Sequence, residues 1–331
     1  MASILQKLFG RRDAAQTGAA PAAYAGAFGK HPAWNDFVDD IGLETQRLID
    51  AKRLLLAGVD TNIAQWDHLH EQQRLDEFRH VFLWASEASV LVGRLWASSD
   101  GKGRTRYPMV AVAECAGISL APVLRQALPA LEQVERRVSA ATTQQEVVAA
   151  ADAARQAMRQ WAASTPPASG AAPAEDLSPA TAAGTLLRRP DLGPAGRGIV
   201  TLLYRLEQEA PHWLAWGRDG KADRDAKSGS PRPAYVRLPA CADNPGDAML
   251  LWARFLANVV SRRAPLLFVA PLGERWVDLV VGEPTPASLY CLRANEKGVP
   301  LTTDIPYSIE PAFAQKAAQF VATAAGTSAV A

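Results

Sequence analysis

The stretch HVFLWASEASVLVGRLWASSDGKGRTRYPMVAVAEC, residues 80–115, contains three apolar runs that are joined by short polar links. The runs are HVFLWAS (80–86), SVLVGRLWAS (89–98) and YPMVAVAEC (107–115). Short runs rich in β-branched and aromatic residues are typical of strands, and strands joined by short links usually lie side by side. The stretch therefore predicts an antiparallel meander, which places the chain in the α+β or α/β class, with an antiparallel sheet flanked by helices.

The residues around the meander predict further elements of such a fold. AGAFG (25–29) is a short strand candidate, and apolar residues at the helical period predict a helix from 44 to 56, which Gly58 is suited to end. After the meander, one helix begins near Ser119. Thr143-Gln-Gln-Glu146 is a capping box that opens another helix, which reaches about residue 161.

The second half of the chain repeats this order of elements. Helices are expected at 199–208 and 247–263, and strands at 234–238, 265–271 and 275–282. A helix therefore precedes a strand pair in each half, so a second α/β half of similar element order is predicted. Duplication of one half and chance resemblance both remain open, because the two halves share few identical residues.

The composition predicts where the chain divides. Residues 164–185 hold four prolines and a single large apolar residue, Leu177, so burial cannot offset the entropy of ordering them. We interpret them as a connector. The predicted divisions are an N-terminal segment (1–23), an α/β domain (24–163), the connector (164–185), a second α/β half (186–310) and an Ala-rich tail (311–331) with one weak helix.

The N-terminal segment contains a short apolar patch. Ile4, Leu5, Leu8 and Phe9 would share one face of a helix, which could dock on a partner or on a lipid surface. A loose chain end is the simpler interpretation, and the sequence does not separate the two.

Composition and charge limit the class of protein. The chain has 331 residues, with 35 Lys and Arg against 34 Asp and Glu, so it lacks the basic excess of dedicated nucleic-acid-binding proteins. It contains no apolar run approaching about 18 residues, so no membrane span is expected. Its three cysteines form no CxxC pair, which favours a reducing compartment. We therefore expect a cytoplasmic protein.

Residues 99–106, SDGKGRTR, are the strongest candidate for binding chemistry. Glycines next to basic residues can surround a phosphate, although the spacing is not that of a Walker loop and a strand is expected to follow. Asp36, Asp39 and Asp40 form a nearby carboxylate group in the sequence. A nucleotide- or phosphate-binding enzyme that uses loop 99–106 with carboxylates 36–40 is therefore one hypothesis. Recognition of an acidic protein surface by the basic residues is another.

Other patterns give weaker signals. His68-Leu-His70 has no supporting cysteine, and residues two apart on a helix point in different directions, so a metal site is not expected. No GxSxG motif is present, and Cys115 and Cys291 lie in apolar contexts. We assign no catalytic residue, no metal ligand and no cofactor.

Two blocks of sequence resemble a known family. The first is Gly29-Lys30-His31-Pro32-Ala33-Trp34-Asn35-Asp36-Phe37-Val38, and it resembles the motif GK-x-P-x-x-x-DFV that opens TagF/ImpM-type proteins associated with type VI secretion. The second block contains Phe82-Leu83-Trp84, Gly93-Arg94-Leu95, Ser98-x-Asp100, Gly103-Arg104 and Tyr107-Pro108, in the order found in that family. The resemblance covers about residues 25–140.

The resemblance implies a non-enzymatic accessory protein of a type VI secretion system that regulates through protein–protein contacts. Such proteins act in the cytoplasm after translation, commonly as repressors. They resemble α/β modules with an antiparallel sheet, and they are linked to a forkhead-associated scaffold protein and to a kinase–phosphatase switch. No catalytic residue comes with the motif.

The matched residues fall into two groups by their expected roles. Turns are expected at Gly29, Pro32, Gly103, Tyr107 and Pro108. The second group binds a partner or clamps the two loops together, and it comprises Lys30, His31, Trp34, Asp36, Asp100, Lys102, Arg104 and Arg106. The sequence leaves the choice between these two roles open.

Overall fold

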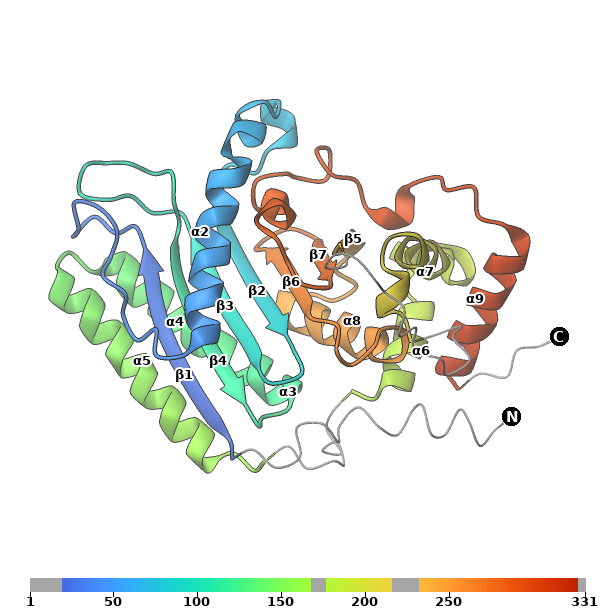
Figure 1. Ribbon diagram of the computed structural model, residues 1–331, viewed down its shortest axis with the longest axis horizontal. Coiled ribbons are helices and arrows are strands. Elements are labelled where there is room, and N and C mark those ends of the chain that lie inside the picture. Colours follow the sequence, from blue (N-terminus) through green and yellow to red (C-terminus); the bar gives the residue numbers. More distant parts are fainter. Residues whose placement is uncertain (1–19, 168–176, 216–231, 327–331) are drawn as a thin grey trace.

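The computed structural model describes residues 20–167, 177–215 and 232–326, and in these ranges seven strands form one antiparallel sheet (Figure 1). Their order across the sheet is β1-β4-β3-β2-β6-β7-β5. The strands are β1 (Ala22–Gly29), β2 (Arg79–Ala85), β3 (Val90–Trp96), β4 (Met109–Ala116), β5 (Ala234–Pro239), β6 (Leu266–Pro271) and β7 (Trp276–Val281). The predicted fold class, an antiparallel sheet flanked by helices, is confirmed.

The predicted meander is formed by β2, β3 and β4. Gly93 lies opposite Phe82 of β2 and opposite Val112 of β4, which fixes the register of all three strands. A Cβ atom on Gly93 would lie 2.1 Å from the Phe82 ring, so glycine leaves the space that this ring fills. The second block of the sequence therefore forms the centre of the first half of the sheet.

Helices cover both faces of the sheet. Helix α2 (Gln46–Asp67) lies across one face together with the 3₁₀ helix η7 (Pro286–Leu292) (Figure 1). The opposite face is covered by α4 (Leu128–Ala140), α5 (Gln144–Ser164) and α8 (Pro245–Val259). The molecule thus has three layers, with the apolar side chains of the strands packed alternately against one helical layer and the other.

Helix α2 is longer than the sequence predicted. The helix was expected to end near Gly58, but it continues to Asp67, and Gly58 lies buried inside it. A Cβ atom at position 58 would lie 2.4 Å from the side chain of Leu289, so glycine serves here for close packing against η7 and not as a helix end. Asn62 and Trp66 then donate to the carbonyls of Pro286 and Tyr290.

The helices that follow the meander begin as expected. Ser119 precedes a short helix α3 (Leu120–Pro122), a π-helical turn η3 (Val123–Ala127) and then α4. The capping box at the start of α5 is confirmed. The Thr143 hydroxyl accepts the Glu146 N–H at 3.3 Å, and the Glu146 carboxylate accepts the Thr143 N–H at 3.0 Å.

In the second half, the predicted helices and strands are found, and the connector needs a correction. The sequence predicts a connector without buried structure over residues 164–185, but its last residues belong to helix α6 (Pro179–Leu187), which Ser178 caps. Residues 168–176 of the connector lie outside the described ranges. The small residues Ala182 and Ala183 of α6 pack fully buried, which a count of large apolar residues does not detect. The remaining helices are α7 (Arg197–Glu209) and α9 (Pro311–Ala324). Residues 1–19, which include the apolar patch, lie outside the described ranges, as do residues 216–231 and 327–331.

The two halves share one sheet. Strand β2 pairs with β6, with Phe82 opposite Val269, so the two halves join in the middle of the sheet. Each half has the order strand, helix, strand, strand, as expected, but α2 and α8 cover opposite faces. A twofold rotation that maps β2 onto its antiparallel neighbour β6 would leave α2 and α8 on the same face of the sheet. The two halves therefore do not repeat one arrangement.

No helix in the described ranges is both long enough and apolar enough to span a membrane.

Candidate functional site

Two loops that carry the matched sequence blocks meet at one end of the sheet. The first follows β1 and turns back along it, where Val38 N–H donates to the Gly29 carbonyl at 2.8 Å. The second joins β3 to β4, and its Gly101 N–H donates to the Trp34 carbonyl at 2.6 Å. Gly29 has a φ of +122°, and a Cβ atom there would lie 2.2 Å from the carbonyl oxygen of Pro108. The close approach of the loops therefore requires glycine at this position.

Asp100 organises the second loop from within. Its side chain is fully buried, and its Oδ1 accepts the backbone N–H groups of Lys102 at 3.0 Å and Arg104 at 3.1 Å. Its Oδ2 accepts Arg104 Nε at 2.6 Å and Lys30 Nζ at 3.1 Å. Gly103, at φ +76°, closes the turn by donating to the Asp100 carbonyl. The amides that a phosphate would use in this loop are thus occupied by the protein's own carboxylate.

Lys30 lies beneath the two loops. Only 3% of its side chain is exposed, and its ammonium donates to Asp36 Oδ1 at 2.5 Å as well as to Asp100. The ammonium also lies 3.9 Å from the centre of the Phe37 ring, a cation–π contact. Two carboxylates and an aromatic face together compensate the burial of this charge.

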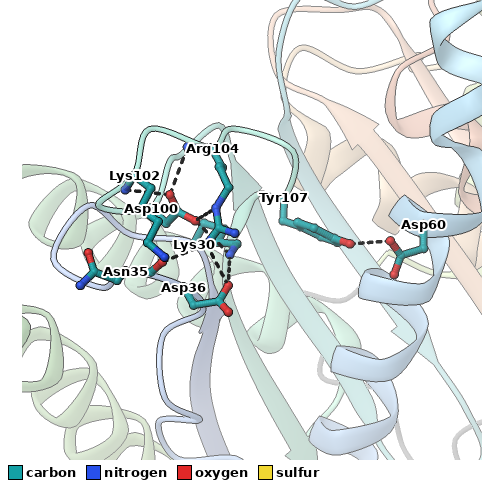
Figure 2. Close-up of polar contacts among 8 residues, drawn as sticks. All are labelled: Lys30, Asn35, Asp36, Asp60, Asp100, Lys102, Arg104 and Tyr107. Carbon is teal, nitrogen blue, oxygen red and sulfur yellow. Dashed lines mark hydrogen bonds and ion pairs between the residues drawn. The ribbon is translucent and has the colours of Figure 1, made fainter.

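Arg104 completes the connection on the outer side (Figure 2). Its Nη2 donates to the Asn35 carbonyl at 2.9 Å and lies 3.3 Å from Asp36 Oδ1. We call Lys30, Asn35, Asp36, Asp100 and Arg104 the joined-loop cluster. The cluster is open to solvent on one side, because the side chain of Asp36 is 71% exposed and that of Arg104 is 51% exposed.

Both carboxylates of the joined-loop cluster remain ionised at neutral pH. Burial raises the pKa of Asp100, but the backbone N–H of Arg104 and the Lys30 ammonium outweigh it and hold the pKa below the ordinary 3.8. The hydrogen bond from Lys30 likewise lowers the pKa of Asp36. Carboxylates with lowered pKa values are weak bases. The arrangement is therefore better suited to fixing a surface by contact than to transferring protons.

Two predicted residues lie beside the cluster and contact α2. The Tyr107 ring packs edge-on against Phe37, with ring centres 5.0 Å apart, and its hydroxyl donates to Asp60 (Figure 2). Arg106 lies 3.5 Å from the same carboxylate. Arg106 is therefore drawn toward α2 and away from Arg104, although the two are close in sequence.

Two other predicted residues point into the protein. His31 Nδ1 accepts the Ala33 N–H at 3.1 Å, so Nε2 carries the proton and donates to the Val138 carbonyl of α4 at 2.9 Å. Trp34 is buried and donates from Nε1 to Asp39 at 3.3 Å. These side chains attach the first loop to the helical layer. Pro32 and Lys102, in contrast, are exposed.

The carboxylates at 36–40 do not form one group. Asp36 belongs to the joined-loop cluster, Asp39 accepts from Trp34, and Asp40 pairs with Lys52 of α2 at 2.5 Å. Among the residues that the structure describes, no three His, Cys, Asp or Glu side chains are grouped so that they could hold a metal ion.

A second charged site, which the sequence did not predict, lies between β5 and β7. Arg237 of β5 lies directly opposite Asp278 of β7, and both side chains are almost completely buried. Arg237 Nε and Nη2 donate to the two carboxylate oxygens at 2.7 and 3.1 Å, and the Tyr235 hydroxyl donates to the same carboxylate. The available signal was a single charged residue within each of two apolar strands, AYVRLP and WVDLVV.

Arg237 also binds the chain that crosses above it. Nη1 donates to the carbonyls of Asn295 and Val299 at 2.7 and 2.9 Å, and Nη2 donates to that of Ala294 at 2.9 Å. All five guanidinium N–H groups are therefore used within the protein. Burial opposes the charge on Arg237, but Asp278 more than compensates and raises the pKa of the guanidinium. The Arg237–Asp278 pair thus fixes the segment after η7 to the sheet.

His80 is another buried ionisable residue, and the charge of Arg237 influences it. It is completely buried in β2, and burial lowers its pKa from 6.5 to about 3, with a smaller contribution from the charges of Arg237 and Arg293. The imidazole is therefore neutral at pH 7.

Comparison of the chain with known protein families and with curated proteins finds no match.

Proposed function

We propose that the protein is a non-enzymatic regulatory subunit of a type VI secretion system, in which the joined-loop cluster forms the contact surface for another secretion protein. A forkhead-associated scaffold is the proposed partner, repression after translation is the proposed effect, and the cytoplasm is the proposed location. The similarity of the two sequence blocks to TagF/ImpM-type proteins motivates this proposal.

One observation carries the proposal furthest. The polar residues of the two blocks that resemble this family make direct contact, although Lys30 and Asp100 are 70 residues apart in the sequence and Asp36 and Arg104 are 68 apart. Lys30 and Asp100 are buried and hold the loops in shape. Asp36 and Arg104 face solvent. A rigid, partly exposed polar surface of this kind suits recognition, because binding it does not require the loops to be ordered first.

Support also comes from the chemistry of the cluster. Its amides and cations are already bound by carboxylates, and those carboxylates are weak bases at neutral pH. A substrate phosphate would have to displace Asp100 from a buried position with four hydrogen bonds. Calorimetry with nucleotides and divalent metals tests this rival function, and heat of binding that is lost in Arg104→Ala would favour it.

The proposal is tested by incubating the immobilised full chain with type VI secretion proteins, a forkhead-associated scaffold among them, and measuring which are retained. We expect wild type to retain one of them, and Arg104→Ala and Asp36→Ala to retain at least about tenfold less, since both variants alter the exposed side of the cluster. Circular dichroism checks that the variants fold.

Arg159→Ala is the matched control. Arg159 is 52% exposed and paired with Glu44 at 2.6 Å, so it resembles Arg104 in exposure and pairing but lies on α5. Retention by Arg159→Ala should equal that of wild type. Equal retention by wild type, Arg104→Ala and Asp36→Ala would contradict the proposal, as would retention of no secretion protein at all.

A further inference from the structure

The loop between β3 and β4 turns its negative charge inward and its positive charges outward. Asp100 is the acidic residue of this loop, and its carboxylate is fully buried among hydrogen-bond donors. Lys102, Arg104 and Arg106, in contrast, are all exposed. The tip of the loop therefore presents a positive surface on a chain whose net charge is only +1.

Donors at this tip remain available to a partner. Nε and Nη2 of Arg104 are bound to Asp100, Asn35 and Asp36, and within the described ranges Nη1 has no hydrogen-bond partner. Among the described residues, the Lys102 ammonium makes no hydrogen bond or ion pair; only its backbone N–H is bound. Two cationic groups on one five-residue turn are thus unsaturated, whereas Arg106 is already paired with Asp60.

An open depression of about 400 Å³ adjoins the tip. Four hydroxyl residues line it, Ser98, Ser99, Thr105 and Ser139, together with Trp96 and other small or apolar side chains. Its lining contains no Asp, Glu, Lys or Arg side chain, and His31 lies at its inner wall with both ring nitrogens hydrogen-bonded within the protein. Hydroxyl groups can both donate and accept, so the depression can accommodate the polar main chain of a segment that is bound at the tip.

We propose that this tip and depression bind an acidic, extended segment of the partner protein, with carboxylates on Lys102 and on Nη1 of Arg104. This inference rests on the proposed function and specifies the partner's chemistry. The number of free donors favours carboxylates over phosphate, because a phosphate dianion usually gathers several cations and the third basic residue is engaged elsewhere.

Fluorescence anisotropy with a labelled decaglutamate peptide and the full chain tests the inference. At low salt the peptide should bind wild type, and Lys102→Glu should weaken binding at least about tenfold by reversing one contact charge. Binding should also weaken as the salt concentration rises. Thr105→Trp, which fills the depression without changing charge, should weaken it as well.

Lys297→Glu is the matched control. Lys297 is an exposed lysine whose N–H donates to the side chain of Asn295 at 2.9 Å, just as the N–H of Lys102 donates to Asp100. It lies in the other half of the protein. Unchanged affinity in Lys297→Glu supports a specific site. An equal loss in both charge reversals, or no binding of decaglutamate by wild type, would overturn the inference.

Two further probes identify competing ligands. Tighter binding of a phosphothreonine peptide than of decaglutamate, with the same sensitivity to Lys102→Glu, would reject the carboxylate in favour of phosphate. Preference for a single-stranded oligonucleotide would reject a protein partner.

If a secretion protein is captured equally by wild type and Lys102→Glu, this inference fails while the proposed function stands. If decaglutamate binds and no secretion protein is captured, the proposed function fails alone.

Discussion

The joined-loop cluster and the Arg237–Asp278 pair use the same chemistry for different ends. Each places a cation among carboxylates and carbonyls, and each fixes a segment of chain to the sheet. Arg237 is completely buried and all of its donors are used, whereas Arg104 is half exposed and its Nη1 makes no hydrogen bond within the described part of the chain. A closed network can contribute to the fold alone, while a network that is open on one side can also bind.

The largest difference between the two sites is expected in stability. Asp278→Ala should reduce the free energy of unfolding by about 3–5 kcal/mol, because it leaves the Arg237 charge buried without its carboxylate. Urea unfolding followed by circular dichroism measures this. The double variant Arg237→Met with Asp278→Leu should lose less than Asp278→Ala, since no charge then stays buried. A loss below about 1 kcal/mol in Asp278→Ala would show that the pair is not the closed network described above.

The buried side chains of His80 and Asp100 should respond to acid in different pH ranges. Because burial lowers the pKa of His80 from 6.5 to about 3, the unfolded chain takes up its proton first as the pH falls. The stability contributed by neutral His80 is therefore complete above pH 6.5 and is lost below it, at up to about 1.4 kcal/mol per pH unit. The lowered pKa of Asp100 acts in the same direction, but only as the pH falls below 3.8.

The comparison of wild type with His80→Leu isolates the loss of stability that protonation of His80 causes below pH 6.5. Between pH 7 and pH 5, wild type should lose about 2 kcal/mol more than His80→Leu in urea unfolding. Parallel losses in the two proteins would mean that His80 can be protonated in the folded state.

The smallest effect on stability is expected at the open cluster. Arg104→Ala should lower the free energy of unfolding by at most about 1 kcal/mol, because the side chain is half exposed and Lys30 and two backbone N–H groups still hold Asp100. Thermal and urea unfolding measure it. A loss as large as that of Asp278→Ala would remove the contrast between the sites and would assign Arg104 to the fold alone.

Local signals in the sequence were sufficient for the first half of the fold. The apolar runs at 80–115 predict the meander, and Thr143 with Glu146 predicts the start of α5, because each signal is complete within a few residues. The joined-loop cluster could be anticipated because its members lie in two blocks with a common resemblance. The sequence could not show which of the matched residues face inward, since His31 and Trp34 are buried by contacts with α4 and within their own loop.

The features that were missed depend on contacts distant in sequence. Gly58 indicates a helix end unless Leu289 is known to pack on it, and the alanines of α6 are buried only because neighbouring helices cover them. The partnership of Arg237 with Asp278 spans 41 residues and is set by the register of β5 on β7. No property of either strand alone specifies that register.

The pairing of β2 with β6 has a consequence for synthesis of the chain. Strand β2 is complete by Ala85, but the strand that pairs with its outer edge begins only at Leu266. Until the ribosome has delivered that later stretch, the nascent polypeptide carries an apolar strand whose amide and carbonyl groups on one side lack their final partner. The window in which a chaperone is needed, or in which two growing chains can adhere to one another, therefore lasts for most of translation.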